Sequence, residues 1–144
     1  MGLNLSSTAF QQFTKVHVAA YKLGGGRFLP WVLGRERTVL VDHVGRRSGE
    51  QRTSPLLYLA DGDDVVVVGS KGGSRRHPAW WLNLREMDET TIQLGGERRR
   101  VKVREATPSE RERLWPRLVD IWPDYARYQE RTDREIPLGI LSPT

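Results

Sequence analysis

Residues 38–59 read TVLVDHVGRRSGEQRTSPLLYL and contain two strand-like runs on either side of a glycine-bounded loop. Residues 38–44 and 51–59 follow a period of two, which is typical of half-buried strands. Gly45 and Gly49 bound the basic loop that separates them. This stretch therefore predicts a strand, a turn and a returning strand, the first hairpin of a mainly β protein with peripheral helices (α+β).

Four further segments have the composition and spacing of strands: residues 65–70, 90–94, 98–106 and 136–141. Residues 61–63 (DGD) and 95–96 (GG) are turns of the kind that closes a hairpin. Pro55 lacks the N–H that a central strand needs, which indicates an edge or a bulge where a ligand could approach the backbone. Short strands joined by tight turns predict an antiparallel barrel of about six strands.

Helical segments are predicted on both sides of the strands. Residues 7–22 carry an apolar stripe that ends at the glycines 24–26, so we expect a peripheral N-terminal helix packed on the core. Because Lys15, Lys22 and Arg27 flank this stripe, peripheral contact with a membrane is the alternative. Residues 107–110 (TPSE) form a capping box with proline at the first helical position, which predicts a second helix.

Aromatic side chains concentrate in two short helical turns. Pro78 begins a turn that carries Trp80 and Trp81, where free N–H groups and the helix dipole favour a negative ligand. Adjacent helical residues point about a quarter-turn apart, so we expect one tryptophan to pack inward and the other to flank a ring system. Burial of both in the core is the alternative. A later turn places Tyr125 and Tyr128 on one helical face.

The composition fits one domain over residues 1–144, with the barrel core at residues 38–142. The 23 Lys and Arg residues exceed the 18 Asp and Glu, and the net charge of +5 favours an anionic partner such as a phosphorylated cofactor, nucleic acid or acidic lipid. The chain has no cysteine, so redox chemistry requires a bound cofactor. No long apolar run or signal sequence is present, and we expect a cytoplasmic protein, either a monomer or a homodimer.

Two basic turns offer donors for an anion. The loop 45–49 combines two glycines with Arg46, Arg47 and Ser48, and Arg52 follows on the returning strand. Residues 70–73 (SKGG) form a second cationic turn. An ordinary solvated turn is the alternative for each of them. Together with the tryptophans, these turns indicate a planar, phosphorylated ligand.

Other site chemistries find little support in the sequence. The three histidines are scattered without carboxylates at ligand spacing, so we expect no metal site. The nucleophile elbow of serine hydrolases is missing. Residues 98–100 (RRR) are interpreted as an exposed, solubilising face of a strand, with a nucleic-acid patch as the alternative.

Five motifs occur in order along the chain: residues 45–56 (GRRSGEQRTSPL), 68–73 (VGSKGG), 77–84 (HPAWWLNL), 122–128 (WPDYARY) and 132–137 (TDREIP). Together they resemble the deazaflavin-dependent nitroreductase family over about residues 38–142. The resemblance implies a split β-barrel, similar to that of FMN-binding proteins, and coenzyme F420 (an 8-hydroxy-5-deazaflavin) as the hydride carrier. This cofactor joins a planar deazaflavin through a ribityl chain and a phosphodiester to a glutamate tail.

By this resemblance, the phosphate and tail would be held by Arg46, Arg47, Ser48 and Arg52. Two strand segments would line the deazaflavin: Thr53, Ser54, Pro55, Leu56 and Leu57 in one, and Val68, Gly69, Ser70 and Lys71 in the other. The phosphate and ring would be closed in from the helix start by Ala79, Trp80, Trp81, Leu82 and Asn83. The ring would be contacted from the substrate side by Tyr125.

The implied activity is an F420-dependent reductase that transfers a hydride to a conjugated electrophile such as a quinone, an enone or a nitroaromatic. Tyr125 and Tyr128 are the candidate catalytic residues, and orienting the acceptor is the preferred role over donating a proton. Efficient nitroimidazole reducers of the family carry tyrosines near the substrate pocket where this chain has Leu57 and Trp122, so we expect poor nitro-drug reduction. Three alternatives remain open. They are an FMN-binding split-barrel reductase, a non-catalytic F420 carrier, and a nucleic-acid-binding module that uses Arg75, Arg76 and residues 98–100.

Overall fold

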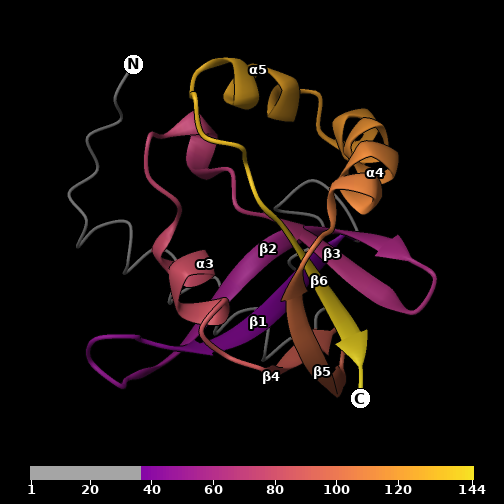
Figure 1. Ribbon diagram of the computed structural model, residues 1–144. Coiled ribbons are helices and arrows are strands. Elements are labelled where there is room, and N and C mark those ends of the chain that lie inside the picture. The colour runs from indigo at the N-terminus through magenta and orange to yellow at the C-terminus, as the bar shows by residue number, and fades with distance from the viewer. Residues whose placement is uncertain (1–36) are drawn as a thin grey trace.

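The computed structural model describes residues 37–144, in which six strands form a closed barrel in the order β1-β2-β3-β6-β5-β4 (Figure 1). Their bounds are β1 Thr38–Val44, β2 Gln51–Asp61, β3 Asp64–Val68, β4 Glu89–Leu94, β5 Glu97–Glu105 and β6 Leu138–Pro143. All neighbouring strands are antiparallel, so the predicted antiparallel barrel is confirmed. The helix predicted at residues 7–22 lies outside the described residues.

The strand bounds differ from the sequence-based prediction at two places that border the site. Strand β3 ends at Val68 because Ser70 has helical backbone angles and begins the short 3-10 helix η1 (Lys71–Gly73). Strand β6 begins two residues later than predicted. Ile136 lies before the strand, where its N–H donates to the side-chain oxygen of Gln129 at 3.0 Å instead of to a neighbouring strand.

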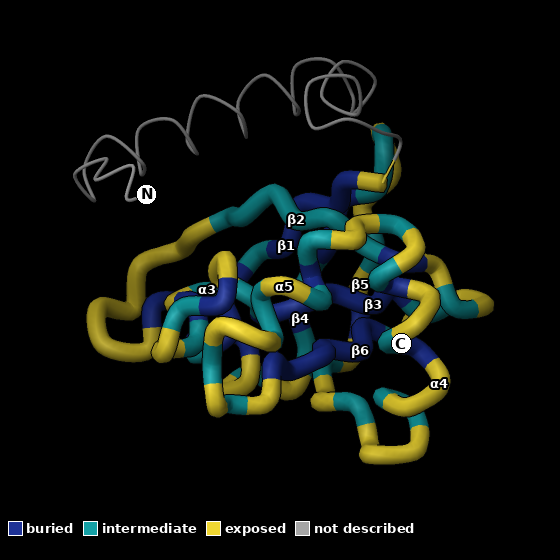
Figure 2. The backbone as a smooth tube through the Cα atoms, turned by 90° about the horizontal axis from the view of Figure 1, so that it is seen from above, coloured by how far each residue is buried: buried dark blue, intermediate teal, exposed yellow. Residues whose placement is uncertain are grey.

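Two hydrophobic clusters stabilise the barrel, one in its interior and one between its outer surface and the helices. Strand β3 belongs to both, because Val65 and Val67 pack in the first cluster while Val66 and Val68 pack in the second. A strand buried on both faces has no polar positions, which explains the four consecutive valines. Figure 2 shows this burial as dark blue along β3 and β6.

Helix α3 (Ala79–Leu84) contributes Trp81 and Leu84 to the interior cluster. Trp81 is only 1% exposed. A Cβ atom at Gly139 of β6 would lie 2.9 Å from Cζ3 of this indole, so the ring approaches the strand more closely than any other residue would permit. The helix is thereby held against the barrel at its second tryptophan.

Helices α4 (Pro108–Ile121) and α5 (Asp124–Glu130) lie together on one side of the barrel (Figure 1). Leu114 and Leu118 of α4 and Tyr125 of α5 bury their side chains in the second cluster. The predicted capping box is confirmed, since the Glu110 N–H donates to Thr107 Oγ1 at 3.3 Å and the Thr107 N–H donates to Glu110 Oε1 at 2.9 Å. Local sequence thus fixes where α4 begins.

Strand β2 changes its neighbours along its length. Residues 51–57 pair with β1, whereas pairing with β3 begins only at Tyr58. Within residues 37–144, the first half of β2 therefore has one paired side and one free side. Pro55, opposite Leu40 of β1, lies in this half, in agreement with the edge predicted from its missing N–H. Backbone groups on the free side are available to a ligand.

Candidate functional site

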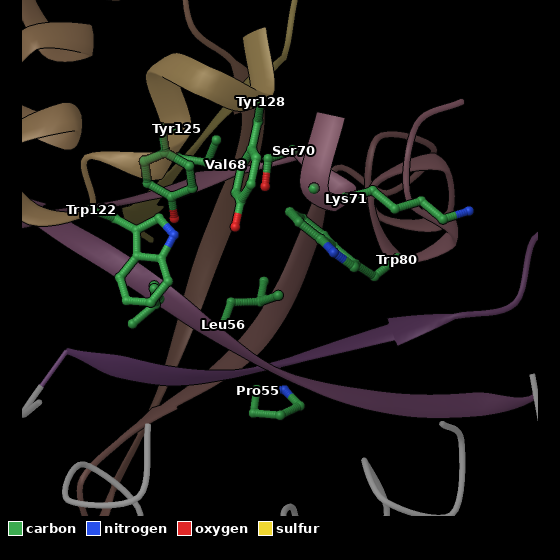
Figure 3. A pocket seen from close by; sticks show the side chains of 11 residues that line it. Pro55, Leu56, Val68, Ser70, Lys71, Trp80, Trp122, Tyr125 and Tyr128 are labelled. Carbon is green, nitrogen blue, oxygen red and sulfur yellow. The ribbon is translucent and has the colours of Figure 1, made fainter. Parts of the chain in front are cut away.

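A pocket of about 270 Å³ lies beside the free half of β2. It is lined by Pro55, Leu56, Leu57, Val68, Ser70, Lys71, Gly72, Trp80, Trp122, Tyr125 and Tyr128. In Figure 3, Trp80 and Lys71 lie on one side and Trp122 and Tyr125 on the other, with Leu56 and Pro55 below. Aromatic and aliphatic side chains on facing walls are suited to a flat ring.

Two tyrosines of α5 provide the polar groups of the aromatic wall. The rings of Tyr125 and Tyr128 lie 6.2 Å apart at 71°, and Figure 3 shows both hydroxyls directed toward β2. Tyr125 is 6% exposed, and burial raises the pKa of its phenol above the usual value, so the group stays protonated. Neither hydroxyl forms a hydrogen bond within the part of the chain that the structure describes. Both are therefore available to a ligand in the pocket.

Close packing of η1 against α5 fixes the position of Tyr128. Gly73 has φ +83, and a Cβ atom there would lie 2.5 Å from the backbone oxygen of Tyr128. Only glycine accepts both this backbone angle and this approach. The guanidinium of Arg131 also lies 5.6 Å from the centre of the Tyr128 ring, at cation–π distance.

Arg134 holds the segment that forms the opposite wall. Its guanidinium donates to the backbone oxygens of Ser74 (2.7 Å), Gly69 (3.1 Å) and Ser70 (2.7 Å) and to Nδ1 of His77 (2.9 Å). The same segment contains Lys71, which has a φ of 44, a backbone angle unusual for a residue other than glycine. Four charge-assisted bonds from one side chain stabilise this strained turn beside the pocket.

The basic loop between β1 and β2 is attached to α3 by a buried amide. Oδ1 of Asn83 accepts from the backbone N–H of Arg46 and from Arg46 Nη1, both at 3.1 Å. Asn83 is 4% exposed and lies one helical turn after Trp80, which lines the pocket. This contact therefore couples the position of the loop to the position of a pocket wall.

A histidine lies behind that amide. Nδ2 of Asn83 and Nδ1 of His43 are 3.1 Å apart, and Nε2 of His43 and Oγ of Ser54 are 2.9 Å apart. His43 is 3% exposed. Burial is the main cause that lowers its pKa from 6.5 to about 4, with a further decrease from the charge of Arg52 and an opposing effect of Asp42. The ring is therefore neutral at physiological pH.

The cations around the site differ in how they are engaged. Arg52 pairs with Glu50 at 3.2 Å, although its side chain stays 43% exposed. Within residues 37–144, Arg47 and Lys71 form no ion pair or hydrogen bond through their side chains. By contrast, each arginine of residues 98–100 pairs with a carboxylate. Positive charge that is free to meet an anion is thus found near the pocket, whereas the three arginines of residues 98–100 are paired.

The structure brings together most of the residues predicted for the site. The predicted site residues that line the pocket are Pro55, Leu56, Leu57, Val68, Ser70, Lys71, Trp80, Tyr125 and Tyr128. The predicted residues that do not line it are Arg46, Arg47, Ser48, Arg52, Thr53, Ser54, Gly69, Ala79, Trp81, Leu82 and Asn83. The first four of these belong to the basic loop and the start of β2, where the phosphate and tail were predicted, and their role stays a prediction.

Three predicted residues have structural contacts that explain their absence from the pocket wall. Trp81 packs in the interior cluster, which leaves Trp80 as the tryptophan that faces the pocket. Asn83 binds Arg46. Thr53 donates to Asp42 at 2.8 Å. Any contact of these three with a cofactor stays a prediction.

Sequence reasoning did not single out Arg134 and His43 for the site, and it included Gly72 only as part of the cationic turn at residues 70–73. The resemblance placed Trp122 near the substrate pocket as a departure from the family, and Trp122 does line the pocket, with 38% of its surface exposed. Arg134 belongs to a quoted motif, but its four acceptors lie 57 to 65 residues away in the chain. No local pattern reports such a contact.

Two searches of the described residues were negative. No group of three or more His, Asp or Glu side chains in residues 37–144 is arranged to hold a metal ion. None of the described helices is both long and apolar enough to cross a lipid bilayer.

The fold and the pocket define a split β-barrel protein with a pocket suited to a flat ring, next to a basic loop. Residues 13–143 match the family model described as F420H(2)-dependent quinone reductase, and the chain belongs to this family. The resemblance found in the sequence motifs is thereby confirmed.

Similar proteins support the same grouping. A protein of Mycobacterium tuberculosis, described as a candidate F420H(2)-dependent quinone reductase, is 43% identical over 106 residues, covering 74% of this chain and 89% of the relative. A solved structure of an F420-H2 dependent reductase has a TM-score of 0.67 and 34% identity, covering 74% of this chain and 94% of that one. Another, described as a domain-swapped dimer, has a TM-score of 0.71 and 29% identity, covering 95% of this chain and all of that one (100%).

Proposed function

We propose that this protein is a reductase that uses reduced coenzyme F420 to reduce quinones. The observation that carries the proposal is the pocket of about 270 Å³ between aromatic walls, beside the free half of β2 and next to unpaired cations. Membership of the F420H(2)-dependent quinone reductase family supports the same assignment. An enone or a nitroaromatic would share the flat, conjugated shape of a quinone.

The chemistry of the donor set fits this cofactor. Small-molecule pockets usually enclose roughly 300–1,000 Å³, so a pocket of about 270 Å³ suits the ring system and leaves the phosphate and tail outside. Outside lies the basic loop, where Arg47 has no carboxylate partner within the described residues. The flat ring would thus lie in an apolar pocket, and the acidic tail would lie against the neighbouring basic loop.

Each part of the site would have its own task. Arg46, Arg47, Ser48 and Arg52 would hold the phosphate and tail, because guanidinium and hydroxyl groups donate to phosphate oxygens. The free backbone edge at residues 53–57 would bind the polar edge of the ring, and Trp80 would pack against its plane. When bound, reduced F420 supplies two electrons as a hydride to an acceptor lying against its ring.

Tyr125 and Tyr128 would orient the acceptor. A raised phenol pKa makes Tyr125 a weak acid, so donating a hydrogen bond suits it better than giving up its proton. The exposed indole of Trp122 borders the pocket, where a second flat molecule could lie. Since Leu57 and Trp122 stand where efficient nitroimidazole reducers have tyrosines, quinones are the preferred acceptors.

The alternatives are not favoured. The FMN-binding alternative is disfavoured because residues 13–143 match the F420H(2)-dependent quinone reductase family. The nucleic-acid alternative rested on Arg75, Arg76 and the arginines of residues 98–100, and the last three are each engaged by a carboxylate. Assembly as a homodimer is supported by likeness to a structure described as a domain-swapped dimer, and size-exclusion chromatography with light scattering would test it. A cytoplasmic location, and membrane contact through residues 7–22, stay predictions of the sequence.

The deciding experiment is a fluorescence titration with F420, followed by turnover of reduced F420 with a soluble quinone. Arg52→Ala should weaken cofactor binding by roughly 10- to 150-fold, the range for losing a charge-assisted hydrogen bond. Arg100→Ala removes the same charge from β5, where Arg100 pairs with Glu89, and should leave binding unchanged. Absence of F420 binding would refute the function, and tight binding without turnover on any acceptor would indicate a cofactor carrier instead.

A further inference from the structure

His43 is a buried titratable residue to which the proposed reaction gives no task. It lies on β1, is 3% exposed and does not line the pocket. Its neighbours are nevertheless parts of the site: Asn83 of α3 on one ring nitrogen and Ser54 of β2 on the other. A buried imidazole that is hydrogen-bonded to two residues of the site requires an explanation.

The orientation of the Asn83 amide follows from its partners. Two donors of Arg46, its backbone N–H and its Nη1, meet a single atom of this amide at 3.1 Å. That atom must be the carbonyl oxygen, because an NH2 group cannot accept. The NH2 group of Asn83 therefore faces Nδ1 of His43, which must offer a lone pair.

The tautomer of His43 follows in turn. With Nδ1 accepting, a neutral ring carries its proton on Nε2 and donates it to Oγ of Ser54 at 2.9 Å. Each of the four groups thus has a single compatible arrangement, from Ser54 through His43 and Asn83 to Arg46. An amide that loses its acceptor at Nδ1 is free to turn, and a turned amide would oppose its NH2 group to the donors of Arg46.

We propose that His43 is a positioning residue that, through Asn83, fixes Arg46 for binding the anionic end of the cofactor. Asn83 occupies the backbone N–H and Nη1 of Arg46, so Nε and Nη2, which have no partner within residues 37–144, are left to meet an anion. Neighbouring Arg47 has no such attachment in the described chain. The cofactor assignment rests on the proposed function, whereas the positioning of Arg46 does not.

Two substitutions of His43 separate positioning from simple packing. His43→Asn keeps an acceptor at the place of Nδ1, because Oδ1 of asparagine branches from the same carbon position. His43→Gln carries its amide one carbon further out, near Ser54, and leaves Asn83 without that acceptor. Both variants remove the ring and stay neutral, so a purely structural role predicts similar losses in melting temperature and identical effects on the loop.

The first measurement uses the protein without cofactor. Hydrogen exchange of the Arg46 backbone N–H, followed by NMR, reports whether its bond to Asn83 persists. We expect exchange in His43→Gln to be about tenfold faster than in His43→Asn, corresponding to one lost hydrogen bond. Equal exchange rates in the two variants would overturn the inference, whether or not F420 binds.

The second measurement compares two ligands by fluorescence titration. F420 should bind His43→Gln about tenfold more weakly than His43→Asn, because its phosphodiester and tail lose a fixed Arg46. The deazaflavin–ribityl fragment, which lacks both, should bind the two variants equally. A parallel loss for the fragment would assign His43 to the ring pocket and refute the positioning of Arg46. If wild-type protein binds no F420 while the exchange difference persists, the cofactor assignment fails and the positioning of Arg46 stands.

Discussion

The buried position of His43 predicts that this protein loses stability in mildly acidic solution. In the folded protein the pKa of His43 is lowered from 6.5 to about 4, first by burial and then by the charge of Arg52, against the opposing effect of Asp42. Between these two values the unfolded chain binds a proton that the folded chain does not. The free energy of unfolding therefore decreases as the pH falls from about 6.5 toward about 4.

The size of the effect follows from the two pKa values. Each unit of difference corresponds to roughly 1.4 kcal/mol, and at about pH 4.5 most of the interval has been crossed. Protonation of His43 in the unfolded chain should therefore lower the free energy of unfolding by about 2.5 kcal/mol at about pH 4.5, relative to its value at about pH 7.5. Because the side chain is 3% exposed, screening by solvent should reduce this figure little.

The assay is urea unfolding of wild type and His43→Asn, followed by fluorescence of the five tryptophans. Asparagine does not titrate, so only wild type should lose this stability as the pH falls. The unfolding free energy of wild type minus that of His43→Asn should therefore decrease by about 2.5 kcal/mol between about pH 7.5 and pH 4.5. His77, whose pKa is also lowered, is present in both proteins and cancels. Glu110, with a pKa lowered from 4.5 to about 2, acts in a more acidic range. A difference that stays constant with pH would refute a neutral, buried His43.

Four further outcomes follow from the structure. Arg134→Lys replaces a guanidinium that makes four hydrogen bonds. It should lower the free energy of unfolding, measured in urea, by at least about 2 kcal/mol and weaken F420 binding. Unchanged stability and binding would show that Arg134 does not hold the pocket wall. Gly73→Ala should cost about 2–4 kcal/mol, against about 1–2 kcal/mol for Gly62→Ala, which has a similar φ of +60 but no atom near the new Cβ. Tyr125→Phe should raise the KM for a quinone by about 5- to 15-fold with little change in kcat, and a large fall in kcat with cofactor binding intact would instead indicate proton donation. F420 affinity should decline as salt rises, because exposed charge pairs are screened; affinity that is independent of salt would contradict binding of the tail by the basic loop.

Local patterns account for what the sequence could predict of the fold. The strand periodicity, the two glycine turns and the capping box at Thr107 depend on neighbours a few residues away, and each is found where expected. The start of β6 was placed two residues early. The backbone of Ile136 is engaged by Gln129 of α5, and strand propensity carries no information about a helix packed alongside.

The candidate site was predictable in kind more than in detail. Spacing indicated that one tryptophan of the pair would pack inward, but only the approach of Gly139 in the folded barrel shows that this is Trp81. The four bonds of Arg134 join segments that are distant in the chain. The tautomer of His43 depends on Asn83 of α3 and Ser54 of β2, and the orientation of Asn83 depends in turn on Arg46. Such arrangements arise only after the barrel has closed.

Arg134 also makes the structure of the pocket wall depend on the order in which the strands of the barrel fold. The loop it holds follows β3, whereas Arg134 itself lies just ahead of β6, the strand that joins β3 to β5 and closes the sheet. Until β6 docks, the turn containing Lys71 lacks the side chain that stabilises its strained backbone. The wall that contains Lys71 can therefore be completed only after Arg134 and β6 have been synthesised and have docked on the barrel.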